Sequence, residues 1–290
     1  MPLKLPACLS IPPAADCSTV PAAPMRQLLL VLLLLSVAGQ CESQLAPGPW
    51  ADPSLPPAQR AELLLANLTL AEKVGLLHGT NGRTFGFSAG VQRLGVPGVS
   101  SIAWTGPGSG PTMTAWPTGL AIAATFDDSA AAAWGKGKGE EAFEKGGNVD
   151  IEIPLCLTRT PNNGRAWEYL SGEDPFLGAK VAAAAVRAVQ AEGIVANVKH
   201  FADNSQEDNR EGVSADIDER TQWEMFYPPF QSAVEAGAGS VMCSLNRING
   251  RWACENEQAL NVDLKGRMNF SGWVMYVSRT LVEFEMQVCF

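Results

Sequence analysis

Charged residues are scarce in this sequence. Only 18% of its 290 residues are Asp, Glu, Lys or Arg, whereas soluble chains typically contain about 25%. Hydrophobic residues make up 46%, and this balance excludes an intrinsically disordered chain. Basic residues are scarcer than acidic ones, 21 against 30, which gives a net charge of −9. Because such a chain repels phosphate backbones, we expect no nucleic-acid partner.

Metal and cofactor motifs are also missing. The chain has two histidines, His78 and His200, and no cysteine pair at metal-ligand spacing. No Gly-rich phosphate-binding fingerprint follows a predicted strand, which argues against a dinucleotide site. We therefore expect neither a metal ion nor a cofactor.

No apolar run is long enough to span a bilayer. The longest, Leu28–Ala38, has eleven residues, and a spanning helix needs about 20. It follows the basic segment Met25-Arg26-Gln27 and precedes small residues, as in a secretory signal peptide. We interpret residues 1–40 as a leader, with translation starting at Met25, and expect a secreted protein with no membrane attachment after cleavage. A buried core helix is the alternative.

Two further features fit an oxidising, extracellular compartment. Cys243 and Cys254 flank Asn249-Gly250, a strong tight-turn signal, so the two arms of the turn either bring the sulfurs together as a disulfide or leave two unpaired thiols. Asn67 and Asn269 each begin an acceptor sequence for N-glycosylation.

The chain length allows one large domain or two small ones. Residues 41–56 form a Pro-rich arm. Thr69 and Glu72 have the spacing of a capping box, which predicts a short helix that stops at Gly79. The Gly- and Pro-rich stretch 86–111 is expected to be a long surface loop.

The remainder alternates between helical and extended patterns. Helices are predicted at 128–145, from Asp174-Pro175 to Gly193, at 230–236 and at 257–268; strands are predicted at 148–155, 194–198, 240–242 and 273–275. Apolar strands that follow helices at this spacing indicate parallel β/α units. The predicted fold class is therefore α/β. A (β/α)8 barrel is favoured because polar residues end the strands, and a doubly wound open sheet is the competing topology.

Two segments could carry chemistry. Lys199-His200 ends a predicted strand, where a cation and an imidazole can bind sugar hydroxyls, act in acid–base chemistry or, for the lysine, form a Schiff base. A structural ion pair is the simpler interpretation. Residues 161–168 contain Arg165, Trp167 and Glu168, groups that suit either a carbohydrate site or a structural turn.

Acidic residues crowd the segment after His200, and most of them are expected to form a solvated loop. They are Asp203, Glu207, Asp208, Glu211, Asp216, Asp218 and Glu219. Glu173-Asp174 is expected to cap the helix that follows it.

Five stretches together resemble the N-terminal barrel domain of family 3 glycoside hydrolases, the secreted β-glucosidase and β-xylosidase type. In family order they are RLGVPGV, TAWPTGLAIAATFD, TPNNGRAWEYLSGEDPFLG, VKHFADNSQE and SVMCSLNRINGRWACEN. They fall within residues 57–275, which we take as the domain.

This resemblance implies a (β/α)8-like barrel, followed in full-length members by an α/β sandwich domain. It also implies retaining hydrolysis of β-linked gluco- or xylo-oligosaccharides or aryl glycosides. That mechanism uses an Asp nucleophile and a Glu acid/base about 5–5.5 Å apart.

The resemblance also assigns roles by position. Arg165, Lys199 and His200 match residues that hold the sugar in the cleaving subsite, and Met242 matches a pocket-lining position. Cys243 and Cys254 match a disulfide of fungal-type members.

The sequence departs from the family at functional positions. Thr105 stands where members carry a sugar-binding Asp, and Leu245 stands where a pocket Tyr is usual. Val277 occupies the place of the nucleophilic Asp, and no other residue takes that role. Loss of a charge-assisted hydrogen bond costs about 1.5–3 kcal/mol, and loss of a nucleophile costs several orders of magnitude in rate. We therefore expect weakened sugar binding and a very poor catalyst.

Residues 276–290 resemble nothing in the family and are typical of translation out of frame or into an intron. The favoured interpretation is a truncated β-glucosidase-type hydrolase, whose barrel is incomplete at its C-terminal end. Such a barrel would leave an unpaired strand edge and reduce solubility. The alternatives are a secreted, catalytically dead sugar-binding protein on the same barrel and, less favoured, a Schiff-base lyase that uses Lys199.

Overall fold

The computed structural model describes residues 48–77, 79, 88–102, 113–277 and 286–289. The leader, His78 and Thr105 lie outside the described residues. Residues from Ala46 onward form one compact unit. None of the helices that the structure describes is both long and apolar enough to cross a membrane.

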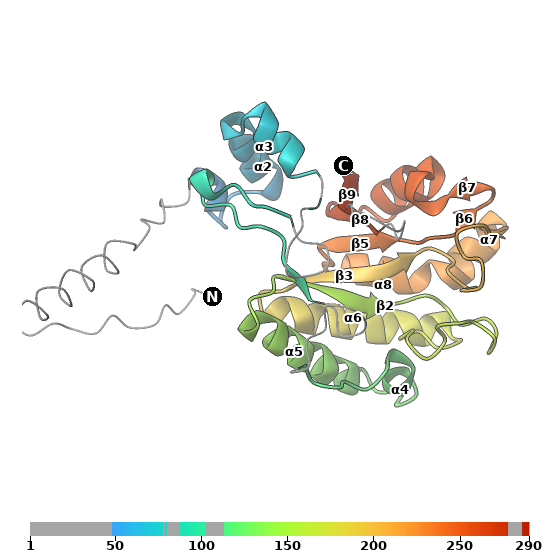
Figure 1. Ribbon diagram of the computed structural model, residues 1–290. Coiled ribbons are helices and arrows are strands. Elements are labelled where there is room, and N and C mark those ends of the chain that lie inside the picture. Colours follow the sequence, from blue (N-terminus) through green and yellow to red (C-terminus); the bar gives the residue numbers. More distant parts are fainter. Residues whose placement is uncertain (1–47, 78, 80–87, 103–112, 278–285, 290) are drawn as a thin grey trace, which may run out of the picture. The chain divides into compact units, whose positions relative to one another are not determined.

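The centre of this unit is a six-stranded sheet with the order β1-β2-β3-β5-β8-β9 (Figure 1). Its strands are β1 (Ser101–Ile102), β2 (Val149–Pro154), β3 (Val195–Phe201), β5 (Ser240–Cys243), β8 (Trp273–Val277) and β9 (Met286–Cys289). The first five strands pair in parallel, and β9 pairs antiparallel to β8. The parallel strands follow chain order with no reversal, which is the topology of a barrel and not of a doubly wound sheet. The described strands therefore form a parallel half-barrel, and they do not close into a ring of eight.

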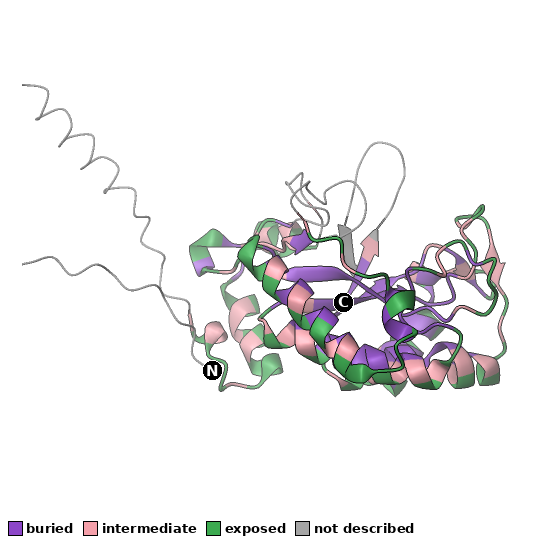
Figure 2. Ribbon diagram, turned by 90° about the horizontal axis from the view of Figure 1, so that it is seen from below, coloured by how far each residue is buried: buried purple, intermediate pink, exposed green. Residues whose placement is uncertain are grey.

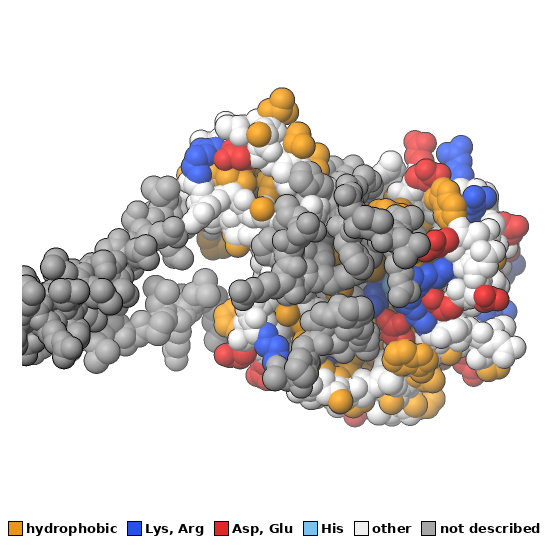
Figure 3. Space-filling model, viewed as in Figure 1, with side chains coloured by type: hydrophobic (Ala, Val, Ile, Leu, Met, Phe, Trp, Pro, Cys, Tyr) orange, Lys and Arg blue, Asp and Glu red, His pale blue; other side chains and the backbone are white. Residues whose placement is uncertain are grey.

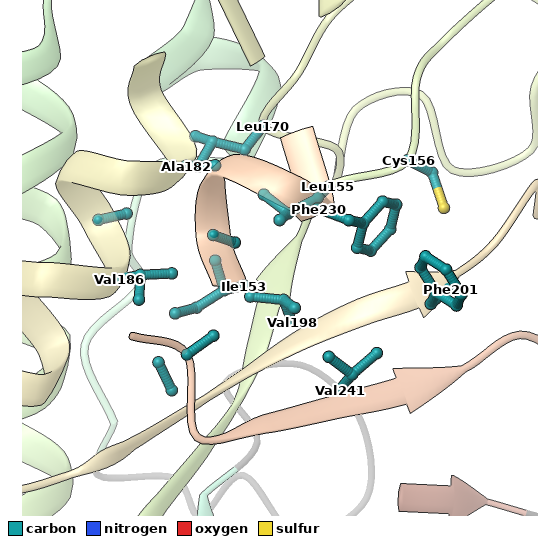
Figure 4. Close-up of a cluster of buried hydrophobic side chains, with 14 of the residues drawn as sticks. Ile153, Leu155, Cys156, Leu170, Ala182, Val186, Val198, Phe201, Phe230 and Val241 are labelled. Carbon is teal, nitrogen blue, oxygen red and sulfur yellow. The ribbon is translucent and has the colours of Figure 1, made fainter. Parts of the chain in front are cut away.

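The connecting helices cover one face of the sheet. They are α4 (Gly119–Ala123), α5 (Asp128–Glu144), α6 (Pro175–Ala191) and α8 (Pro228–Glu235). Strand residues Ile153, Val198 and Val241 point toward Val186 and Phe230 of these helices in a continuous apolar core (Figure 4). Strands β1, β2, β3 and β5 are buried almost throughout, whereas the outward faces of the helices are exposed (Figure 2).

Local signals set the bounds of α6 as the sequence predicts. The Asp174 Oδ1 accepts hydrogen bonds from the backbone N–H groups of Phe176 and Leu177, at 2.8 and 3.3 Å, and Pro175 occupies the first helical position. Gly193 follows the helix with a φ of +81°, a left-handed conformation that glycine adopts without strain. The chain then enters β3 directly.

The second face of the sheet carries its own apolar cluster. Val149, Ile151, Met242 and Met275 are buried there, with Val195 of β3 packed against them. This cluster forms the floor beneath the polar groups at the carboxyl ends of the strands.

Shorter elements fill the connections. They are η1 (Pro49–Ala51), α2 (Pro57–Asn67), α3 (Leu70–Gly75), η2 (Gln92–Leu94), β4 (Ser214–Ala215), α7 (Glu219–Thr221), the π-helix η3 (Gln222–Phe226), β6 (Arg247–Ile248), β7 (Arg251–Trp252), η4 (Ala253–Glu255) and the π-helix η5 (Gln258–Arg267). Strands β4, β6 and β7 form a separate small sheet.

Several predicted boundaries need correction. The stretch 86–111 is not only a surface loop, because β1 lies within it and its Ser101 and Ile102 are buried. The capping box at Thr69 and Glu72 is present, but its helix ends at Gly75 rather than Gly79. Helix α2 was not predicted.

The described sheet stays open, as expected of an incomplete barrel, but it ends one strand beyond β8. Residues 276–277 continue β8, and β9 then pairs along it, so the outer edge of β8 is not unpaired. Part of segment 276–290, which the sequence analysis set apart from the family, is therefore strand in this structure.

Close packing of α5 on α6 yields a stability prediction. A Cβ on Gly135 would lie 2.6 Å from the carbonyl oxygen of Ala185, so Gly135→Ala must push the two helices apart. We expect it to lower the free energy of unfolding by about 1–3 kcal/mol in urea denaturation.

Gly75→Ala is the matched control, because nothing lies within 4 Å of its added Cβ. This variant should be neutral or should gain up to about 1 kcal/mol. Equal effects of the two substitutions would contradict the packing described.

Candidate active site

A cluster of charged side chains lies at the carboxyl ends of β2 and β3 (Figure 3). The loop of residues 158–172 and the segment 202–210 complete it. The structure places Lys199 and His200 at the carboxyl end of β3, as the sequence predicts, and the strand runs one residue further to Phe201. Both residues are buried.

Lys199 is held by two carboxylates. Its Nζ lies 2.9 Å from Oε1 of Glu168 and 3.7 Å from Oε1 of Glu152, and its side chain is only 7% exposed. A buried ammonium is tolerated when it is paired in this way. The ion pair therefore ties β3 to the 158–172 loop.

Arg165 extends the cluster from the same loop. Its Nε lies 3.0 Å from Oε1 of Glu207, and its Nη1 lies 3.6 Å from Oε2 of Glu168 and 3.4 Å from Nε2 of His200. The side-chain oxygen of Asn163 accepts a hydrogen bond from the Arg165 backbone N–H and shapes the turn. The predicted trio Arg165, Lys199 and His200 is thus brought together.

His200 is a neutral imidazole in this environment. Burial first, and then the positive charges of Lys199, Arg165 and Arg210, hold the pKa of its ring well below the usual value. Its Nε2 faces the Arg165 guanidinium, and within the described residues its Nδ1 has no hydrogen-bond partner. A neutral ring offers one donor and one acceptor, which suits a sugar hydroxyl.

Three residues of the cluster were not identified from the sequence as site residues: Glu152, which lies within β2, Glu207 and Arg210. Glu207 was grouped with the solvated acids, but its Oε2 lies 2.7 Å from Nη1 of Arg210, and its Oε1 accepts a hydrogen bond from Asn204 at 2.8 Å. Arg210 was overlooked, although its spacing of three residues from Glu207 is a pairing signal. The amide of Asn204 also reaches the Tyr169 hydroxyl, 2.9 Å away.

The other acidic residues after His200 are solvated, as the sequence predicts, except for Asp203. Asp208, Glu211, Asp216, Asp218 and Glu219 are exposed, as expected. Asp203 is buried.

The arrangement is suited to binding hydroxyl groups. Guanidinium and ammonium groups donate, carboxylates accept, and each hydroxyl of a sugar can do both. In the part of the chain that the structure describes, no group of three His, Cys, Asp or Glu residues is placed to hold a metal ion.

The remaining predicted positions lie around this cluster. Met242 is buried in the apolar floor, and Leu245 is half-buried just after β5. Val277 ends β8, the strand next to β5 in the sheet.

Cys243 and Cys254 form a disulfide, with their Cα atoms 5.2 Å apart. It closes the segment that contains the β6–β7 hairpin and its Asn249-Gly250 turn. Asn67 and Asn269 are both exposed.

A parallel half-barrel with a polar cluster at the carboxyl ends of its strands is typical of the β/α-barrel enzymes. The chain belongs to glycosyl hydrolase family 3, since residues 92–281 match the model of that family's N-terminal domain. It is 37% identical over 250 residues to beta-glucosidase A of Aspergillus kawachii. That match covers 79% of this chain and 29% of the relative, so the chain spans under a third of the length of the curated relatives that it matches.

Solved structures agree with this assignment. DesR, a beta-glucosidase from Streptomyces venezuelae solved in complex with D-glucose, is 36% identical with a TM-score of 0.70, covering 75% of this chain and 28% of that one. The beta-D-glucoside glucohydrolase of Trichoderma reesei is 33% identical with a TM-score of 0.72, covering 76% and 32%. The chain is therefore a member of a family of glycoside hydrolases of the β-glucosidase type.

The buried ion pair yields a second prediction. Glu168→Gln removes the nearest negative charge from buried Lys199, so we expect a loss of about 3 kcal/mol in the free energy of unfolding. The exposed pair of Arg220 and Glu224, at 2.9 Å, provides the control. Glu224→Gln should cost less than about 0.5 kcal/mol. Similar losses in urea denaturation for both variants would refute the structural role of the Lys199 pair.

Proposed function

We propose that this chain carries the sugar-binding part of a retaining β-glucosidase subsite. The observation that carries the proposal is the convergence of Arg165, Lys199 and His200, with Glu168 and Glu207, on the carboxyl ends of β2 and β3. Glucose in the structures of two relatives supports a glucoside as the ligand. Gluco- and xylo-oligosaccharides and aryl glycosides are the candidate substrates.

In this proposal the residues bind and orient the sugar. Lys199 and Arg165 donate hydrogen bonds to adjacent hydroxyls, and their carboxylate partners accept from the same hydroxyls. His200 contributes its neutral ring. The ion pairs with Glu168 favour Lys199 as a positioning cation over a Schiff-base lysine, which would be kept away from carboxylates.

Position 277 decides between hydrolysis and binding alone. By resemblance, the nucleophilic Asp belongs at this position, and Val277 has no lone pair with which to attack an anomeric carbon. We therefore propose that this chain binds glucosides without cleaving them. For the protein as a whole, a family 3 hydrolase is the first candidate and a dedicated sugar-binding protein on the same half-barrel is the second, which Val277 favours.

The fold and the setting are part of the proposal. The sequential parallel strands support the first half of a (β/α)8 barrel, with the domain spanning residues 57–275. The Cys243–Cys254 disulfide and the exposure of Asn67 and Asn269 support secretion and N-glycosylation.

Val277→Asp tests the proposal directly. Dinitrophenyl β-glucoside needs no protonation of its leaving group, so a nucleophile alone suffices to form the glycosyl-enzyme. We expect a burst of about one equivalent of dinitrophenolate and a gain in protein mass of one glucosyl group, whereas the unchanged protein gives neither.

Val277→Asn is the matched control, because it has the shape of Asp but cannot attack, and it should give no burst. The α-anomer should give none with any variant. A folded Val277→Asp protein that forms no adduct would overturn the assignment of position 277.

A further inference from the structure

Asp203 is a buried carboxyl group that the sugar-binding cluster does not use. It lies three residues after His200 and is only 3% exposed. Its φ of +67° is a left-handed conformation, which a non-glycine residue adopts only when its surroundings hold it there. Its placement therefore calls for a physical explanation.

The contacts of Asp203 join three parts of the fold. Its Oδ1 accepts a hydrogen bond from Nε2 of Gln222, 3.1 Å away in η3. The preceding carbonyl, that of Ala202, accepts from the Ser244 hydroxyl at 2.6 Å and from the Asn246 amide at 3.2 Å, both after β5. Ala202 and Asp203 together thus hold the end of β3 between η3 and the segment after β5.

One residue further along, the same segment enters the sugar site. Asn204 donates from its Nδ2 to Glu207, which in turn binds Arg165 and Arg210. A shift of the backbone at position 203 would therefore move a carboxylate that holds two guanidinium groups of the site. His200 lies three residues before Asp203 in the same short segment of the chain.

The second oxygen of Asp203 is unusual. Among the described residues, Oδ2 is buried without any hydrogen-bond partner, which penalises the carboxylate more than the neutral acid. The titratable groups that face Asp203 are the Cys156 thiol, after β2, and the Tyr227 hydroxyl, after η3. Both are neutral at physiological pH, and Tyr227 donates to Asp263 of η5. On its own strand, His200 is neutral as well.

Burial accordingly raises the pKa of Asp203 to about 7, while the hydrogen bond from Gln222 opposes the shift. The folded segment binds a proton that a solvent-exposed aspartate would release near pH 4. Between pH values of about 4 and 7 an exposed Asp203 would be ionised while the buried one stays protonated. Rising pH in this range therefore favours conformations in which Asp203 reaches water.

We propose that Asp203 is a positioning residue whose protonated form holds the His200–Asn204 segment in the sugar-binding geometry, so that raising the pH from acid to neutral loosens the site. This inference rests on the proposed function for its effect on sugar, but the movement of the segment can be observed without sugar. The site binds glucosides more tightly in acid than at neutral pH, and the fold stays intact through the transition.

The chain has only two histidines, which makes the ring signals of His200 a specific probe. In a nuclear magnetic resonance titration of the full chain from pH 5.5 to 8.5, with a His78→Gln variant for assignment, we expect one step in the His200 signals near pH 7. Burial and the neighbouring cations hold the pKa of the ring below its usual value, and the Asp203→Asn variant separates titration of Asp203 from titration of the ring itself. In parallel, the Kd for D-glucose should rise about fivefold or more from pH 5.5 to 8.5.

Asp203→Asn keeps the shape and the acceptor oxygen for Gln222 but cannot ionise. It should abolish the His200 step and leave the Kd nearly constant over this range. Asp208→Asn, at an exposed acid of the same segment, should change neither result. A step that persists in Asp203→Asn, or no step in the unchanged protein, would overturn the proposal; absence of glucose binding with the step intact would overturn the proposed function alone.

Discussion

The buried ammonium of Lys199 is the constraint on which the site depends. It lies at the end of a parallel strand with 7% of its side chain exposed, where an unpaired charge would be costly. The Glu168 carboxylate pairs with the Lys199 Nζ at 2.9 Å, and the Glu152 carboxylate lies 3.7 Å from the same nitrogen. Since Glu168 comes from the loop after β2, the pairing fixes that loop over the sheet. The same loop carries Arg165, whose guanidinium therefore lies beside Glu168 and His200.

Negative and positive side chains alternate from Glu168 outward through the site. Arg165 lies between Glu168 and Glu207, and Glu207 also binds Arg210. Each group restrains the next, so the cluster presents donors and acceptors in fixed positions above an apolar floor. Such preorganisation is what a sugar site needs, because hydroxyls on a ring have fixed directions. The half-barrel supplies the rigidity, and Asp203 anchors the segment that carries Glu207.

Much of this could be predicted from local signals. The N-cap at Asp174 and the glycine at 193 located α6, and the apolar run that follows located β3. Glu207 was misassigned because an acid within a run of acids looks solvated until its partner is known. Strand β1 was hidden in a Gly- and Pro-rich stretch, since two residues give no periodicity. The pairing of β9 with β8 could not be predicted, because it depends on how two separate segments align and not on their composition.

We propose that this cluster binds glucose through the Lys199 ion-pair network. Calorimetric titration of D-glucose into the full chain, compared with a folded Lys199→Met variant, tests it most directly. We expect saturable binding of about one glucose per chain for the unchanged protein and none for the variant, because the donor is lost and Glu168 loses its nearest cation, with Arg165 farther away at 3.6 Å. Equal binding by the two proteins, or none by the folded unchanged chain, would contradict it.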